Sequence, residues 1–294
     1  MRGIVPGRGG ADKSESRPAA AALPTNQGLA MSDPLFSVAG QVVLVSGASR
    51  GIGRSMAEGF ARREATVIIT GRDAATLEQT ARAIAPPGGS VRPVVCDVAD
   101  RAAIDRLVKT VLDEFGRVDT LVNVAGVNRR MPAERLTEDD YDFILDINLK
   151  GPFLLSLAVG RHMLARGRGN QINVSSLNND RPLKGVLPYA MSKAGLGHMT
   201  RALALEWGPR GVRVNALAPG FVITDLSRKL WSEPHMQAWH DANCPLRRLG
   251  QPGDMVGTAI FLASEASAWM TGQILYVDGG FSAGLAWPID FDRQ

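Results

Sequence analysis

Two side chains that can exchange a proton stand four positions apart in this chain. Tyr189 and Lys193 enclose Ala-Met-Ser, and this spacing places both on one face of a helix. A lysine ammonium about 5 Å from a phenol stabilises the phenolate by roughly 3 kcal/mol at an effective dielectric near 20, and so lowers the phenol pKa by about two units. Such a tyrosine can act as a general acid and base. The alternative is an ordinary surface pair, but with three tyrosines in 294 residues chance seldom produces this spacing.

A glycine-rich turn directly after the first predicted strand indicates phosphate binding. The run Ser46-Gly-Ala-Ser-Arg-Gly-Ile-Gly53 joins a predicted strand to a helical pattern. Glycines let the backbone approach a phosphate, and a helix N-terminus offers free N–H groups and partial positive charge. The spacing differs from the GxGxxG fingerprint, and glycine-rich turns also occur for structural reasons. Its place after the first strand favours a dinucleotide pyrophosphate site.

The elements that must position these residues follow from alternating patterns. Short β-branched runs predict strands at 42–45, 66–70, 91–96, 120–124, 171–174, 213–216 and 274–277. Patterns of 3.6-residue period predict helices at 52–63, 74–84, 101–115, 190–207 and 254–263. This alternation is typical of parallel sheets covered by helices. We therefore expect the α/β class: a single Rossmann-type doubly wound domain with a seven-stranded parallel sheet and helices on both faces.

The ends of the chain and one internal interval depart from this alternation. Residues 1–32 are rich in Gly, Ala, Pro and Ser and lack apolar periodicity, so we predict a disordered N-terminal extension. Residues 33–294 then form the one folded domain. The interval of about 221–250 has no clear strand and carries Trp231 and Trp239, which predicts a helical insertion that caps the site.

Composition excludes several classes of protein. Half of the net charge of +4 lies in residues 1–32, so the rest offers no basic stripe for nucleic acid. Cys96 and Cys244 form no CxxC, and His235 and His240 are five positions apart, so we expect no metal site and no disulfide framework. No uninterrupted apolar run reaches about 18 residues, so we expect no membrane span. A reducing cytoplasm is the expected compartment.

Several motifs in one order resemble the short-chain dehydrogenase/reductase family. They are the turn Ser46–Gly53, Asn123-Val-Ala-Gly126, Asn148, Ser176 thirteen residues before Tyr189, Lys193, Pro219-Gly220 followed by Thr224, and Val277-Asp-Gly-Gly280. The resemblance covers about residues 36–281. Two positions depart from it: Ser46 replaces the usual Thr, and Val124 replaces the second Asn of Asn-Asn-Ala-Gly. The second change puts the hydrogen bonding within the sheet in doubt.

The resemblance implies a reversible hydride transfer between a nicotinamide and a carbonyl or alcohol carbon. It implies that Tyr189 is the general acid and base, and that Lys193 lowers its pKa and holds the nicotinamide ribose. It further implies that Ser176 binds the substrate oxygen and that Asn148 holds a proton-relaying water. Ser175 is one position too early for this spacing, and we assign it a structural role.

The same resemblance implies an NAD(P)-binding catalytic domain over residues 33–294. The cofactor residues that it implies are Gly47, Ser49, Arg50, Gly51, Ile52, Asp97, Val98, Asn123, Ala125, Gly126, Tyr189, Lys193, Pro219, Gly220, Val222 and Thr224. Asp97 and Val98 would hold the adenine, and Pro219, Gly220, Val222 and Thr224 would line the nicotinamide.

The end of the second predicted strand favours NADP. In an NAD site an acidic residue at this place would accept a hydrogen bond from the adenosine 2′-hydroxyl. This chain has Gly71 there, and Arg72 follows it. Arg72 and Arg50 can form a fork for a 2′-phosphate. Asp73 is expected to cap the next helix. NAD stays the alternative cofactor.

The expected substrate is a small polar hydroxy or keto compound, for example a sugar or sugar acid. Charged residues of the predicted cap and the run after Ser176 suggest a polar rim; they are Leu177-Asn-Asn-Asp-Arg181, Arg228, Lys229, Arg247 and Arg248. Simple solvated loop charges are the alternative reading. The interval 237–250 resembles gluconate 5-dehydrogenases and, more loosely, 3-oxoacyl-[acyl carrier protein] reductases.

Two other functions are weighed against this one. The first is reduction of a 3-oxoacyl thioester, since basic residues can also bind a carrier. The second is a dinucleotide sensor without catalysis, which has no need of the residues Asn148, Ser176, Tyr189 and Lys193. Residues 254–263 and 274–277 predict an apolar sheet edge, and we expect a homotetramer.

Overall fold

A parallel sheet of seven strands organises the part of the chain that the structure describes. This computed structural model describes residues 33–89, 91–225, 227–285 and 287, so the prediction for residues 1–32 lies outside it. The strands are β1 Val42–Ser46, β2 Thr66–Gly71, β3 Val91–Val95, β4 Thr120–Asn123, β5 Gly169–Val174, β6 Val212–Pro219 and β7 Ile274–Val277. Their order across the sheet is β3-β2-β1-β4-β5-β6-β7, and every neighbouring pair is parallel.

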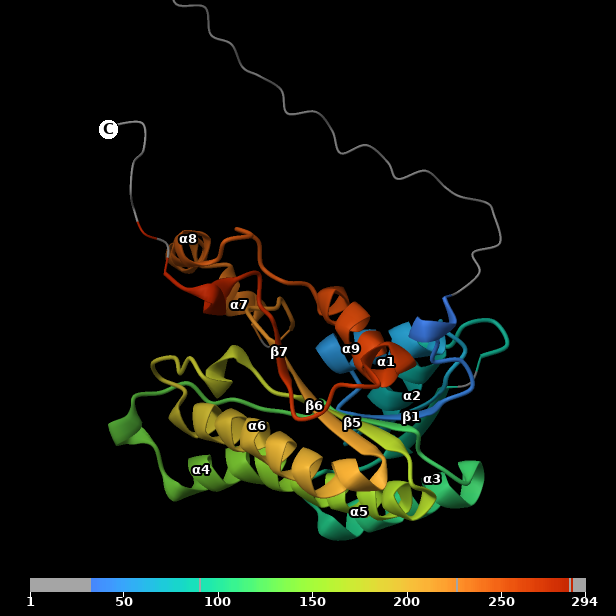
Figure 1. The fold of residues 1–294 in the computed structure, drawn as a ribbon. Coiled ribbons are helices and arrows are strands. Elements are labelled where there is room, and N and C mark those ends of the chain that lie inside the picture. Colours follow the sequence, from blue (N-terminus) through green and yellow to red (C-terminus); the bar gives the residue numbers. More distant parts are fainter. Residues whose placement is uncertain (1–32, 90, 226, 286, 288–294) are drawn as a thin grey trace, which may run out of the picture. The chain divides into compact units, whose positions relative to one another are not determined.

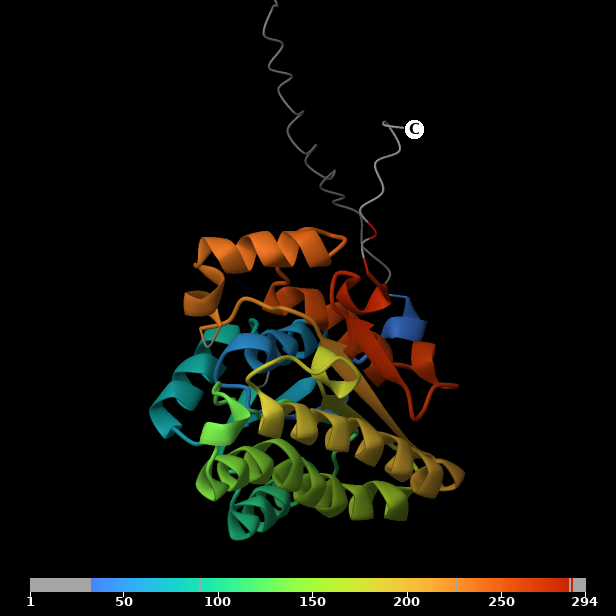
Figure 2. The same ribbon diagram turned by 90° about the vertical axis from the view of Figure 1, so that its left-hand side faces the viewer.

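Helices cover both faces of this sheet (Figure 1). On one face lie α1 Gly51–Ala61, α2 Ala74–Ile84 and α9 Val256–Ala263. On the other lie α3 Arg101–Phe115, α4 Glu138–Leu145, α5 Gly151–Arg166 and α6 Leu187–Trp207. Two short helices, α7 Arg228–Trp231 and α8 Pro234–Asn243, lie beyond the carboxyl ends of the strands (Figure 2).

Side-chain alternation along the strands builds two separate apolar cores. In β1, Val43 and Val45 pack into the core under α1, α2 and α9, whereas Val42 and Leu44 pack into the core under α3, α5 and α6. Both faces of the strand are therefore buried, which explains its uninterrupted β-branched sequence. The predicted doubly wound fold is confirmed, with all seven strands in place.

The periodicity of the sequence did not predict helices α4 and α5. Buried residues of α5 include Gly151, Leu155, Ser156 and Val159, so small and polar side chains interrupt its apolar stripe. Helix α4 is short and begins with acidic residues, held by a capping box between Thr137 and Asp140. Several neighbouring elements bury α5 at once, which explains why its sequence shows no strong single apolar stripe.

The expectation that no segment is apolar and long enough to cross a membrane was too strict. The continuous helical segment Glu138–Arg166 contains an 18-residue window with a mean hydropathy of 1.4. Half of that window is buried inside the protein. Leu155, Val159 and Met163 of this segment belong to the core beneath the sheet, so core packing accounts for its apolar character.

The topology brings the predicted motifs to one edge of the sheet. The strand order reverses between β1 and β4, because β1 continues to β2 on one side while β4 continues to β5 on the other. Ligands of open α/β sheets bind in the crevice at the carboxyl ends of the strands, at such a reversal. The glycine turn follows β1, the Asn-Val-Ala-Gly motif spans the end of β4, and Ser176 follows β5.

Candidate active site

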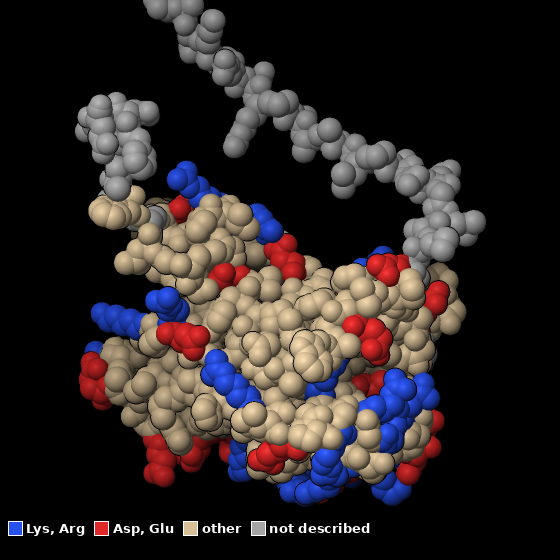
Figure 3. All heavy atoms as spheres, in the orientation of Figure 1, with Lys and Arg blue, Asp and Glu red and all other residues tan. Residues whose placement is uncertain are grey.

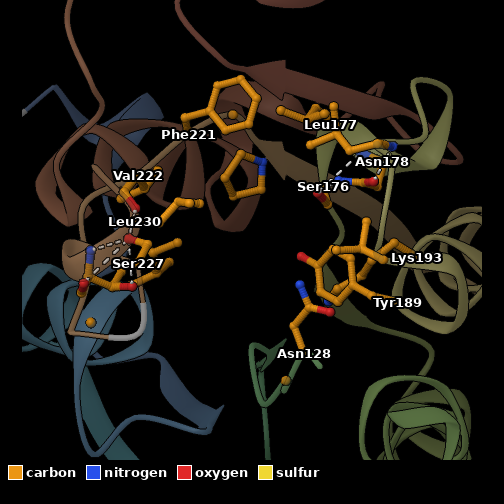
Figure 4. A pocket seen from close by; sticks show the side chains of 18 of the residues that line it. Asn128, Ser176, Leu177, Asn178, Tyr189, Lys193, Phe221, Val222, Ser227 and Leu230 are labelled. Atoms are coloured by element: carbon orange, nitrogen blue, oxygen red, sulfur yellow. Dashed lines mark hydrogen bonds between the residues drawn. The ribbon is translucent and has the colours of Figure 1, made fainter. Parts of the chain in front are cut away.

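A cavity of about 810 Å³ opens at this edge, and most of the predicted site residues line it. Its walls come from the turn after β1, the loop after β4, the end of β5, the first turns of α6, the segment after β6, and the helices α7 and α8. Figure 4 shows Ser176, Tyr189 and Lys193 on one side and Val222, Ser227 and Leu230 on the other. The cavity therefore joins the glycine turn to the Tyr–Lys pair.

The glycine turn is packed so tightly that two of its glycines leave no room for a side chain. Gly47 has a φ of +68°, and a Cβ there would lie 2.6 Å from the Cα of Ala125. At Gly53, a Cβ would lie 2.4 Å from the carbonyl oxygen of Gly47. Arg50 occupies the N-cap of α1 without a side-chain cap bond, so the first N–H groups of this helix stay available next to the cavity. This cradle suits the pyrophosphate of a dinucleotide.

The residues expected to hold the cofactor divide into two groups. Those that line the cavity are Gly47, Arg50, Gly51, Ile52, Ala125, Gly126, Tyr189, Lys193, Pro219, Gly220, Val222 and Thr224. Those that do not line it are Ser49, Arg72, Asp97, Val98 and Asn123. Of the second group, Ser49, Arg72, Asp97 and Val98 follow β1, β2 or β3 at the same sheet edge.

Ser49 and Gly71 make a contact that defines the end of β2. A Cβ at Gly71 would lie 2.3 Å from the Ser49 hydroxyl oxygen, so no acidic side chain fits at this position without displacing Ser49. Arg72 follows and is exposed. Asp73 accepts from the Thr76 N–H at 2.8 Å, so its predicted role as the cap of α2 is confirmed.

Asn123 has its amide directed under the sheet. Its Nδ2 donates to the Asn173 Oδ1 at 2.9 Å and to the Ser156 hydroxyl at 3.0 Å. The Ser46 hydroxyl accepts from the Val124 N–H at 3.1 Å, which ties the end of β1 to the loop after β4. Sequence reasoning missed this role of Ser46 and treated the residue only as a substitute for Thr.

The Tyr–Lys pair lies on one face of α6, beside the end of β5. Lys193 donates from Nζ to the Val174 carbonyl at 2.8 Å, and this Nζ lies 5.7 Å from the centroid of the Tyr189 ring. Ser176 interacts with the Tyr189 phenol and acts to lower its pKa. The Ser175 hydroxyl donates to the Lys193 carbonyl at 3.1 Å, which holds α6 against β5, as its structural assignment predicted.

Burial decides the pKa values of both side chains. It raises the pKa of the Tyr189 phenol above its usual 10.0, while the hydrogen bond from Ser176 and the charge of Arg130 act in the opposite direction. Burial also lowers the pKa of Lys193 from 10.5 to about 8. Burial therefore shifts both the Tyr189 phenol and the Lys193 amine toward their neutral forms in this structure, and the expected effect of Lys193 on the phenol pKa stays a prediction.

Asn148 lies in a π-helical turn, Asp146–Lys150, between α4 and α5. Its Oδ1 accepts from the Val127 N–H at 2.8 Å, and its Nδ2 donates to the Val127 carbonyl at 2.9 Å. The same Nδ2 donates to the Ser192 hydroxyl at 3.2 Å, and Ser192 donates to the Tyr189 carbonyl at 2.7 Å. This amide therefore connects the loop after β4 to the first turn of α6. Local widening of a helix is common at functional sites.

The cap wall differs from the predicted basic rim. Arg228, Lys229, Arg247 and Arg248 do not line the cavity. Arg228 lies 3.9 Å from Asp225, and Arg248 lies 2.7 Å from Asp254. Arg228 and Arg248 lie close to carboxylates, while the neighbouring aromatic residues pack toward the cavity.

An aromatic cluster forms the cap side of the cavity instead. Phe221 packs edge-on against Trp231 and Trp239, with ring centroids 5.0 and 5.6 Å apart. Both tryptophans and Phe221 line the cavity. His240 is buried within the cluster, with its ring centroid 5.9 Å from that of Phe221.

The polar groups on the substrate side come largely from positions that sequence reasoning did not select. Asn128, Arg130, Lys184 and His235 line the cavity. Asn178 also lines it, and its Nδ2 donates to the Ser176 hydroxyl at 3.3 Å. The sequence signal for Asn128 and Arg130 is their place directly after the Asn-Val-Ala-Gly motif.

Comparison with known proteins supports this arrangement. A family model described as enoyl-(acyl carrier protein) reductase matches residues 47–282. Gluconate 5-dehydrogenase of Gluconobacter oxydans is 37% identical over 256 residues, which is 87% of this chain and 100% of the relative. A 3-oxoacyl-[acyl-carrier-protein] reductase of Synechocystis is 39% identical over 248 residues, which is 84% of this chain and 98% of the relative.

A solved structure extends the comparison to the fold. Gluconate 5-dehydrogenase from Burkholderia cenocepacia, in complex with NADP and tartrate, superposes with a TM-score of 0.83 at 34% identity. The match covers 86% of this chain and 99% of that one. The similarity therefore includes the whole sheet and its edge.

Replacing Arg72 by Ala should weaken NADPH binding relative to NADH binding. If Arg72 contacts a 2′-phosphate, loss of a charge-assisted hydrogen bond lowers the affinity ratio by about 10-fold or more. Fluorescence titration with both cofactors measures this ratio. Arg82→Ala is the control, because this exposed arginine of α2 lies near Glu78 and away from the cavity. An unchanged ratio in Arg72→Ala would contradict the assignment.

Replacing Lys193 by Met should change how stability depends on pH. Since the folded-state pKa of Lys193 is about 8 and the ordinary value is 10.5, the unfolded chain binds more protons between these values. The cost of the buried charge is fully present below about pH 8 and is relieved as the pH rises. The wild type should therefore gain about 2 kcal/mol relative to Lys193→Met between about pH 7 and about pH 9.5, as measured by urea unfolding. A difference that does not vary with pH would refute the lowered pKa.

Proposed function

We propose, because the chain belongs to the short-chain dehydrogenase/reductase family, that it transfers a hydride between NADP and a small polar hydroxy or keto compound, such as a sugar or sugar acid. As a member of this family the protein is an oxidoreductase that acts on CH–OH or C=O groups. The observation that carries the proposal is the Ser176–Tyr189–Lys193 cluster, which shares one cavity with the glycine turn.

The cluster can supply the proton that accompanies hydride transfer. The bound nicotinamide supplies or accepts the hydride at the reacting carbon. During reduction, the Tyr189 hydroxyl gives its proton to the substrate oxygen, and the Ser176 hydroxyl donates a hydrogen bond to that oxygen. During oxidation, Tyr189 takes the proton back. The raised pKa of Tyr189 keeps the phenol protonated before reduction, so release of its proton depends on groups that stabilise the phenolate.

Lys193 and Asn148 support this proton transfer through Tyr189. Lys193 is buried, and its ammonium can stabilise a phenolate as the Tyr189 proton leaves. It can also reach the nicotinamide ribose from its place beside the Val174 carbonyl. Asn148 fixes the first turn of α6 through Ser192, which keeps the Tyr189 backbone in place. We retain the proposal that a water bound near Asn148 relays protons.

NADP is the proposed cofactor because of the end of β2. Gly71 offers no carboxylate that would accept from a 2′-hydroxyl, and a side chain at this position would have to displace the Ser49 hydroxyl. Arg72 and Arg50 are both exposed at the same edge and can approach a 2′-phosphate. The solved relative from Burkholderia cenocepacia contains NADP, which supports the same choice. Asp97 and Val98, after β3, are the proposed adenine contacts.

The substrate side of the cavity favours a hydroxylated or anionic compound. Arg130 and Lys184 add positive charge, and Asn128 and Asn178 add amide groups. Apolar rings in carbohydrate sites pack against C–H faces while polar groups read hydroxyls, and the aromatic cap is compatible with this arrangement. The gluconate 5-dehydrogenase relative and the tartrate in the solved relative point to hydroxy acids.

Reduction of a 3-oxoacyl thioester is the second candidate. The aromatic wall of Phe221, Trp231 and Trp239 favours it, since an acyl chain needs an apolar lining. The Synechocystis relative carries that name. A dinucleotide sensor without catalysis is the third candidate, and the complete cluster of Ser176, Tyr189 and Lys193 argues against it.

Tyr189→Phe should abolish turnover and leave NADPH binding intact. The substitution removes the proton donor without changing the ring, so we expect a loss of at least about 100-fold in kcat. The measurement is NADP(H)-linked absorbance with sugars, sugar acids, polyols, small ketones and an acetoacetyl thioester. Fastest turnover of the thioester would favour the second candidate. NADPH binding without any turnover by the wild type would favour the sensor.

The described surface supports a small-molecule enzyme more than a nucleic-acid partner. On the face seen in Figure 3, positive and negative side chains are interspersed. On α3, for example, Arg101 pairs with Asp105 and Lys109 pairs with Asp113. We propose a cytoplasmic enzyme, which agrees with both cysteines being free and buried. Recovery of the protein from an oxidising compartment would contradict this placement.

We expect a homotetramer in solution. Strand β7 is an edge strand whose residues are only half buried, and Trp269 beside it is fully exposed. Such an edge usually finds a partner. Light scattering at micromolar concentration measures the mass directly. A monomeric mass would contradict the expectation.

A further inference from the structure

We infer that Asn128 is a specificity-determining residue that binds a hydroxyl group of the substrate close to the reacting carbon. This inference rests on the proposed function and adds to it a preference for hydroxylated carbonyl compounds over simple ketones. It is independent of the residues that transfer the proton.

The first observation is an amide group without a partner. Asn128 lines the cavity, yet its Oδ1 is inaccessible to solvent and has no hydrogen-bond partner among the described residues. Amide groups that are removed from water are nearly always hydrogen-bonded in native proteins. Because Asn128 lines the cavity, rotation of its amide can turn this oxygen from its closed position toward a ligand, whose hydroxyl would then supply the missing partner.

The second observation is the position of this amide. In Figure 4 the Asn128 side chain lies next to Tyr189, on the floor of the same cavity. Ser176 and Tyr189 hold the oxygen of the reacting carbon in the proposed mechanism. A group held by Asn128 must therefore belong to a nearby part of the same substrate.

The third observation is that the backbone before Asn128 is fixed. Asn148 binds both the N–H and the carbonyl of Val127, at 2.8 and 2.9 Å. Since Asn148 is buried in the π-helical turn, this pair of bonds sets the direction in which the next residue leaves the loop. The unpartnered amide is thus held in place, as a recognition group requires.

The chemistry of an amide matches a hydroxyl. A carboxamide offers one acceptor and two donors, and an alcohol can both donate and accept. A methylene group of an acyl chain can do neither and would leave the amide unpartnered. The other nearby amide, Asn178, already donates to Ser176 and accepts from the Leu183 N–H at 3.1 Å, so it is occupied within the protein.

The test compares two substrates in three proteins. NADPH-linked reduction of 5-keto-D-gluconate and of butane-2,3-dione is measured for the wild type, Asn128→Leu and Asn128→Asp. Leucine is similar in size and removes all hydrogen bonding, whereas aspartate keeps the acceptor and removes the donors. We expect Asn128→Leu to lower kcat/KM for the hydroxylated substrate by about 30-fold or more, and for the diketone by less than about 3-fold. Asn128→Asp should fall between.

The other outcomes overturn the inference in distinguishable ways. An equal loss for both substrates would show a structural role, and circular dichroism would detect misfolding of the variants. A weaker NADPH affinity in Asn128→Leu would show that the amide binds the cofactor instead. Unchanged kinetics would show that it binds nothing. If the wild type reduces the diketone but not the hydroxylated substrate, the reaction class survives and this inference fails. If it reduces neither, the proposed function fails as well.

Discussion

One buried amide, that of Asn148, holds the separate parts of this site in register. Its two ends bind the N–H and carbonyl of Val127, and its nitrogen also reaches Ser192, which in turn binds the Tyr189 carbonyl. The loop after β4 and the first turn of α6 are therefore fixed to the same point. The π-helical turn makes this possible, because it widens the helix where the side chain leaves it.

The parallel sheet provides the frame within which that amide works. Every strand ends at the same edge, so loops that are distant in sequence meet above β1, β4 and β5. Tight backbone contacts then set their spacing, as between Gly47 and Ala125. The glycine turn and the Ser176–Tyr189–Lys193 cluster thus extend directly from the packed sheet, whereas α7 and α8 lie above them.

Local signals in the sequence were enough for the fold and for several of the residues that line the cavity. The strands were predictable because burial on both faces demands uninterrupted β-branched runs, and the glycine turn because its position after β1 has a steric cause. Tyr189 and Lys193 were predictable from a helical spacing of four.

Features that depend on tertiary packing were not predictable. The direction of the Tyr189 pKa shift follows from burial that no local pattern reports. The inward packing of Trp231 and Trp239, with Arg228 and Arg248 turned to carboxylates outside, depends on how the cap lies over the sheet. The unpartnered amide of Asn128 is visible only once its neighbours are in place.

The contact between Gly71 and the Ser49 hydroxyl also bears on how cofactor preference can evolve. An acidic residue at position 71 would collide with Ser49, which itself belongs to the glycine turn. A substitution at position 71 therefore requires the Ser49 hydroxyl to move to another rotamer or Ser49 to be replaced as well. One side chain of the glycine turn thus couples that turn to the end of β2, so a lineage that changes position 71 is expected to show an adjustment at position 49 too.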